Sequence, residues 1–141
     1  MTSSNTATAA LAQLNNITPQ CAIQVPPLLM EGESYAGLIL GKEGEPGRYL
    51  ILLPVEACEL SWPRARDWAQ DIGGDLPTLR ELALLFANLR DQFHRFWYWS
   101  NAEHETRPQL VWGQNFASGI QTVYGRPFRG HARAVRRVNL A

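Results

Sequence analysis

Between residues 60 and 90 the hydrophobic positions recur at the three- and four-residue steps of amphipathic helices. The apolar residues of the second segment are Leu79, Leu82, Ala83, Leu85, Phe86 and Leu89. They predict a helix of about Leu79 to Arg90 with one broad apolar face. Thr78 and Glu81 have the spacing of a capping box, and Pro77 cannot continue a preceding helix, so we expect a sharp helix start.

The segment before it predicts a first helix. Its apolar positions are Trp62, Ala65, Ala69 and Ile72. Ser61 is a suitable N-cap, Pro63 fits the first turn, and Gly73-Gly74 ends the helix with a left-handed residue.

Shorter β-type segments lie on both sides of the two helices. Two precede them, Tyr35–Leu40 and Arg48–Leu53, joined by a Gly- and Pro-rich connector. Four more follow at Trp97–Asn101, Leu110–Phe116, Ile120–Tyr124 and Ala132–Val138. Strands, then two helices, then strands predict an α+β fold with a mostly antiparallel sheet. We expect one domain at 34–141, preceded by a lead-in arm at 1–33 whose first twenty residues are rich in Thr, Ser, Asn and Ala.

The composition supports a packed core but no strong electrostatic partner. Of 141 residues 45% are apolar, and the net charge is zero. The molecule as a whole therefore lacks the charge that would steer it onto nucleic acid or anionic lipid. The distribution is uneven, because residues 31–60 hold six Glu, whereas residues 106–141 hold six Arg and no acid. The arginines either pair with the acidic segment or bind an anionic partner. Their alternation between the two faces of the last strand favours pairing.

The cysteines and the N-terminus limit the cellular context. Cys21 and Cys58 have no metal or redox spacing, so we expect two small buried thiols, with a disulfide as the alternative. The first ten residues lack the basic and apolar regions of a signal peptide, and no apolar run is long enough to span a membrane. We therefore expect a cytoplasmic protein, with virion association left open and no membrane contact.

Four segments in order carry a resemblance to a known family: Gly73–Leu82, Tyr98–Ser100, Trp112–Gly119 and Arg133–Arg137. Together they resemble a bacterial C-type-lectin-like family, that of the C-terminal domain of the Legionella collagen-like adhesin. This family is distantly similar to the formylglycine-generating sulfatase-modifying factors. The resemblance implies two helices against a twisted sheet, with the first and last strands adjacent. It also implies a binding scaffold of the kind found in adhesins and in phage or prophage proteins.

No catalytic group, metal ligand or cofactor is predicted. The calcium-binding motifs of lectins and the late cysteine pair of the sulfatase modifiers are missing from the sequence. His94, His104 and His131 are scattered, and no Ser-His-Asp or Cys-His order has a supporting context. A degenerate enzyme related to the sulfatase modifiers stays a third hypothesis.

The leading hypothesis is a non-enzymatic recognition module, of phage or prophage origin, that binds a protein partner. In the block Trp97-Tyr98-Trp99 we expect Trp99 in the core and one exposed aromatic residue as an anchor. The predicted binding residues are Tyr98, Asn101, Gln114, Asn115, Tyr124 and Arg126. The alternative is a binder of nucleic acid or sulfated polysaccharide that uses the C-terminal arginines. A homo-oligomer is compatible with either function.

Overall fold

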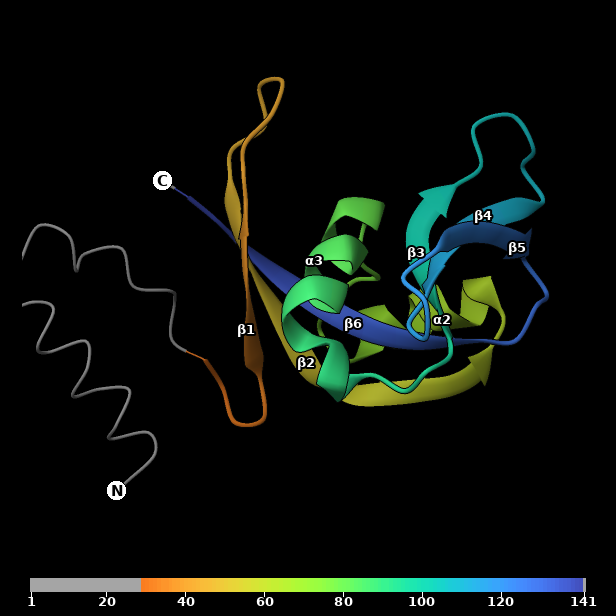
Figure 1. Ribbon diagram of the computed structural model, residues 1–141, viewed down its shortest axis with the longest axis horizontal. Helices are drawn as coiled ribbons and strands as arrows, with labels where there is room; N and C mark the ends of the chain where they lie inside the picture. Colours follow the sequence, from red (N-terminus) through yellow and green to blue (C-terminus); the bar gives the residue numbers. More distant parts are fainter. Residues whose placement is uncertain (1–28, 141) are drawn as a thin grey trace, which may run out of the picture.

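The computed structural model describes residues 29–140, which form an α+β fold with two α-helices and a six-stranded sheet (Figure 1). The elements in order are β1 (Ser34–Ile39), β2 (Arg48–Leu60), α2 (Trp62–Asp71), α3 (Leu79–Leu89), the 3-10 turn η2 (Arg90–Gln92), β3 (Trp97–Glu103), β4 (Leu110–Asn115), β5 (Gln121–Gly125) and β6 (Gly130–Asn139). The α+β prediction is therefore confirmed. Within the described residues no helix is long and apolar enough to cross a membrane.

The strand order of the sheet is β1-β2-β6-β3-β4-β5. Every neighbouring pair is antiparallel except β3 and β6, which are parallel, so the prediction of a mostly antiparallel sheet is confirmed. β2 lies between β1 and β6, so the expected direct neighbourhood of the first and last strands is wrong. In Figure 1 the β1–β2 hairpin lies to the left, β3, β4 and β5 lie to the right, and β6 runs between them.

The two helices cover opposite faces of β6. On one face, α2 packs through Trp62, Ala65 and Ala69 against a cluster that includes Ala132 and Ala134. On the other face, α3 packs through Leu82 and Leu85 against a cluster that includes Val135. Because successive side chains of a strand point to opposite faces, the alternating sequence of β6 serves both cores.

The ends of the helices follow from local chemistry. Thr78 Oγ1 accepts from the Glu81 N–H at 3.1 Å and the Glu81 carboxylate accepts from the Thr78 N–H at 2.9 Å, so the predicted capping box is confirmed. Gly73 has a left-handed φ of 87°, as expected after the end of α2. Ser61 stands at the N-cap of α2, but its side chain makes no capping hydrogen bond, which corrects that prediction.

Two further predictions differ from the structure, and one falls largely outside the described residues. β2 continues to Leu60, whereas the expected strand ended at Leu53. Ala83 is exposed, whereas the neighbouring Leu84 packs against the α3 core. The expected lead-in arm falls outside the described residues as far as position 28, and so does Cys21. Within its last part, Glu33 forms an ion pair with Arg136 of β6 at 2.8 Å.

Candidate functional site

An aromatic surface lies beside the ends of β3, β5 and β6, and we define it as Phe96, Trp97, Tyr124 and Phe128. Trp97 is nearly buried, whereas Phe96, Tyr124 and Phe128 are 49%, 42% and 41% exposed. The Tyr124 and Phe128 rings stack with their centroids 4.2 Å apart, and both meet the Trp97 ring edge to face. These contacts hold the Tyr124 and Phe128 rings against one buried indole, whereas the Phe96 ring stacks on His131.

A hollow of about 350 Å³ opens within this surface. It is lined by Glu59, Phe96, Trp97, Phe128, Arg129, Gly130 and His131. A Cβ added to Gly130 would lie 2.9–3.1 Å from the rings of Trp97 and Trp99, so only glycine lets the β6 backbone approach them this closely. The volume of the hollow is at the lower end of the range typical of ligand-binding pockets.

Glu59 at the rim of the hollow has a left-handed φ of 56°. The pairing of β2 with β6 shifts register between Ala57 and Leu60, so this residue belongs to an irregularity at the end of β2. Side chains other than glycine reach this conformation only at a cost of about 1–2 kcal/mol, and such residues concentrate at functional sites. Glu43 in the β1–β2 connector has a similar φ of 52°, so this conformation is not confined to the hollow.

The six predicted binding residues are not brought together. Tyr124 belongs to the aromatic surface and is exposed as expected. Arg126 is half-buried, donates from Nε to the Pro108 carbonyl at 2.6 Å and pairs with the Glu103 carboxylate at 3.0 Å. Its guanidinium also lies 4.5 Å from the centre of the Trp62 ring. Arg126 therefore connects the β3–β4 loop and the N-terminal end of α2, which indicates a structural role.

Asn101 and Asn115 are half-buried and lie outside the aromatic surface. Asn101 lines a second hollow near Arg137, and its backbone N–H donates to the Pro77 carbonyl at 2.8 Å. Asn115 accepts from the Ala117 N–H at 2.7 Å and so shapes the turn between β4 and β5.

Tyr98 and Gln114 are buried, so the expectation that they form an exposed surface is wrong. Tyr98 alternates with the two tryptophans of β3 and faces the α3 core, where its hydroxyl donates to Glu56 Oε1 at 2.7 Å. Gln114 accepts from Gln121 Nε2 at 2.8 Å. Trp99 is fully buried as predicted, and no residue of the block 97–99 is an exposed anchor.

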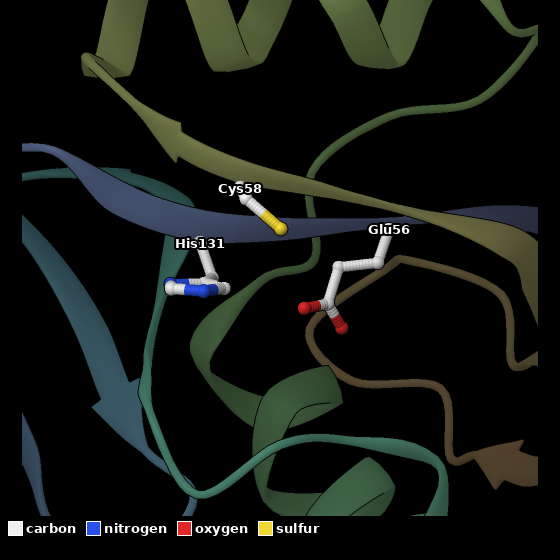
Figure 2. Close-up of side chains that lie close together, drawn as sticks. All are labelled: Glu56, Cys58 and His131. Carbon is white, nitrogen blue, oxygen red and sulfur yellow. The ribbon is translucent and has the colours of Figure 1, made fainter.

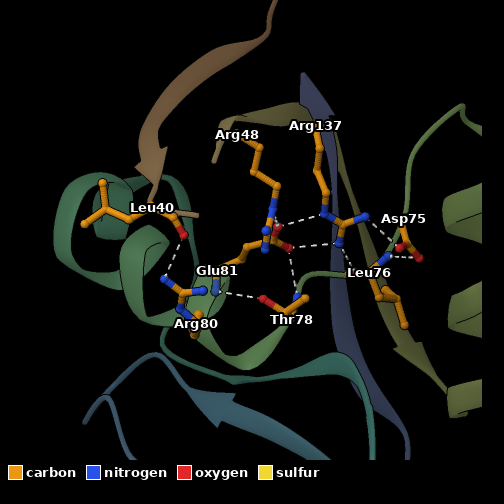
Figure 3. Close-up of polar contacts among 8 residues, drawn as sticks. All are labelled: Leu40, Arg48, Asp75, Leu76, Thr78, Arg80, Glu81 and Arg137. Carbon is orange, nitrogen blue, oxygen red and sulfur yellow. Dashed lines mark hydrogen bonds and ion pairs between the residues drawn. The ribbon is translucent and has the colours of Figure 1, made fainter. Parts of the chain in front are cut away.

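The arginines of β6 make internal contacts. Arg136 binds Glu33, as pairing with the acidic segment predicts, whereas Arg137 binds Glu81 and Asp75, outside that segment (Figure 3). Arg133 is buried and donates to the carbonyl oxygens of Gln92 and Leu53 at 2.6 and 2.8 Å. A structural role is therefore supported for all three.

Glu81 is the buried centre of the contacts drawn in Figure 3. Its carboxylate accepts from the Thr78 N–H, from Arg48 Nε, and from Nε and Nη2 of Arg137, all at 2.7–2.9 Å. Burial alone would raise the pKa of Glu81. The hydrogen bonds from Arg137 and Thr78, with the arginine charge, outweigh burial and hold that pKa below its ordinary 4.5.

A second polar group lies on the α3 side of β2 and β6 and consists of Glu56, Cys58 and His131 (Figure 2). Glu56 also binds His94 Nδ1 at 2.9 Å. Burial and the hydrogen bond to Glu56 raise the pKa of Tyr98 well above its ordinary value. Cys58 is exposed, so the expected burial of its thiol is wrong. It lies near the end of β2, beyond the leucines that pack against α3.

The sequence does not predict Glu56, Cys58 and His131 as a group, because the expected strand stops before the first two. Had β2 been extended to Leu60, their two-residue spacing would have placed both on one face.

No protein-family model and no curated protein matches this chain. Its function therefore has to be inferred from the geometry of the described residues.

Proposed function

We propose that this protein is a non-enzymatic recognition module on a C-type-lectin-like scaffold, and that it binds a protein partner through the aromatic surface. The observation that carries the proposal is the set of three rings, each more than 40% exposed, around the floor formed by Trp97. Large apolar side chains held open to water in this way mark interaction sites. Aromatic residues and Arg are also the usual anchors of protein interfaces.

The hollow suits one large apolar side chain of a partner. It is lined by the rings of Phe96, Trp97 and Phe128 and by the charged residues Glu59 and Arg129. An aromatic or aliphatic anchor entering it would be desolvated on several sides, which is the environment of interface hot spots. Arg129 would face a carboxylate of the partner.

The position of β5 favours a polypeptide over a small ligand. β5 is an edge strand of the sheet, and Tyr124 lies on it. An edge strand presents unpaired backbone N–H and C=O groups that an extended partner segment can bind. Backbone pairing along β5 and an anchor in the hollow would use adjacent parts of the same surface.

The anionic-ligand alternative has less support. It relies on the C-terminal arginines, and Arg133, Arg136 and Arg137 are bound to carbonyl or carboxylate groups of this chain. Arg129 is the exposed arginine at the hollow, so it is the residue through which the alternative can be tested.

The test uses the full chain against a displayed library of random peptides, followed by affinity measurements on synthetic copies of the selected peptides. The Tyr124→Ala, Phe128→Ala double variant should bind them at least about thirtyfold more weakly, since loss of a hot spot costs about 2 kcal/mol or more. Leu40→Ala is the matched control, because Leu40 is an equally apolar, exposed residue in the β1–β2 hairpin. It should bind as the parent does.

Melting temperatures of all variants confirm that folding is intact. Peptides that bind the double variant as tightly as the parent would refute the proposal. Binding of heparin or duplex DNA that falls steeply with salt and is lost in Arg129→Ala would establish the anionic alternative instead.

A further inference from the structure

The pairing of β2 with β6 places a thiol, an imidazole and a carboxylate together. Ala57 pairs with Ala132, so the next residues along the two antiparallel strands, Cys58 and His131, are adjacent and point to one face. Glu56 lies two residues before Cys58 and shares this face. One ligand atom from each of the three side chains lies within 4.8 Å of the other two. Figure 2 shows the three side chains close together beside β2 and β6.

From this arrangement we propose that Glu56, Cys58 and His131 form a site for a divalent transition metal, with Zn²⁺ as the ion that fits best. Sulfur, imidazole nitrogen and carboxylate oxygen are the three donor types that zinc takes from proteins. Ca²⁺ and Mg²⁺ fit poorly, because they require oxygen ligands. Three protein ligands leave the fourth tetrahedral position to water.

The spacing requires only a small adjustment. Zinc bonds of about 2.0–2.3 Å place neighbouring ligand atoms of a tetrahedral site roughly 3.3–3.8 Å apart. Contraction from the 4.8 Å limit is therefore on the order of 1 Å. Cys58 is exposed and can rotate toward the other two ligands.

Neighbouring groups already orient two of the three ligands. The Tyr98 hydroxyl donates to one oxygen of Glu56 at 2.7 Å, and His94 Nδ1 lies 2.9 Å from the other oxygen. The ring of His131 stacks on Phe96 with the centroids 4.4 Å apart. Hydrogen bonds of this kind to ligating side chains are a general feature of metal sites.

The local charge predicts a reversible site. A thiolate and a carboxylate supply two negative charges, but buried Arg133 lies across from Glu56 on β6 and adds a positive charge. The guanidinium reduces the attraction for a cation, so zinc should exchange with a chelator. This inference does not rest on the proposed protein partner, although His131 also lines the hollow.

The test titrates the reduced, chelator-treated full chain with Zn²⁺ and with Co²⁺. We expect one ion per chain and, for Co²⁺, the near-ultraviolet charge-transfer band of a thiolate–cobalt bond. Cys58→Ser should abolish the band, and His131→Gln and Glu56→Gln should weaken zinc binding by on the order of 100-fold or more, beyond what orienting residues usually contribute. Zinc should also slow alkylation of Cys58 by iodoacetamide.

His104→Gln is the matched control, since it removes a ligand-type side chain that does not belong to the group. It should keep the parent's stoichiometry and affinity. Circular dichroism without metal confirms that each variant is folded. A parent protein without the cobalt band, or a Cys58→Ser variant with the parent's zinc affinity, would overturn the assignment.

Discussion

Replacing Arg137 with Met should destabilise the fold, because it removes two of the four N–H donors to the buried Glu81 carboxylate. Breaking a buried ion pair from one side costs about 3–5 kcal/mol. Arg48 and the Thr78 N–H remain, so we expect a loss near 3 kcal/mol in the free energy of unfolding. At about 4 °C per kcal/mol this lowers the melting temperature by roughly 12 °C.

The measurement is urea unfolding at neutral pH, with Arg107→Met as the matched control on an exposed arginine. The control should stay within about 0.5 kcal/mol of the parent. In a double-mutant cycle with Glu81→Gln, which preserves a capping-box residue, the two losses should not add. A loss below about 1 kcal/mol for Arg137→Met would refute the view that this pair is coupled and buried.

The same pair predicts a pH dependence. Because the folded-state pKa of Glu81 is lowered, its contribution is present above the ordinary value of 4.5 and disappears as the pH falls through the lowered pKa. The parent should therefore lose more unfolding free energy than Arg137→Met between neutral pH and about pH 3. Equal losses in the two proteins would contradict this sign.

Two further predictions test the helix and the sheet. Leu85→Ala should lower the free energy of unfolding by roughly 2–5 kcal/mol because Leu85 is fully buried, whereas Thr78→Ala should lower it by about 1 kcal/mol because it removes the capping hydroxyl. Denaturant midpoints in the reverse order would show that the packing described for α3 is wrong. Gly113→Ala should destabilise the fold by about 1–3 kcal/mol or more, because the added Cβ would overlap the Trp97 ring and the Tyr98 carbonyl. Gly125→Ala is the control, since its Cβ would meet only ordinary van der Waals contacts. Equal melting temperatures for the two variants would contradict the close approach of β3 and β4.

Periodicity and capping chemistry predict the helices well because these signals are local. Thr78, Glu81 and Gly73 determine where a helix begins or ends through bonds to their own neighbours, and each is found where the sequence places it. Ser61 is the exception: it stands at the N-cap as predicted, but its side chain makes no capping hydrogen bond.

The candidate sites were harder to predict because they depend on pairing between distant strands. Tyr98 was expected at the surface, but its side-chain direction is set by the alternation that buries Trp97 and Trp99 on the other face of β3. Phe96 and Phe128 come from separate loops, and nothing local in their sequences brings them to one hollow. Glu56 and Cys58 were missed because the expected strand ended at Leu53, with the continuous apolar run, whereas β2 continues to Leu60.

The position of β6 in the sheet has a consequence for how the chain folds during synthesis. Residues 130–139 are the last strand to be made among those described, yet they lie between β2 and β3. Before they leave the ribosome, the β1–β2 hairpin and the β3–β4–β5 meander have no strand to join them. Both hydrophobic cores are then incomplete, since α2 and α3 each pack against residues of β6. Folding must therefore wait for contacts of high sequence separation, which slow folding and leave the edges of the hairpin and of the meander exposed until β6 pairs with both.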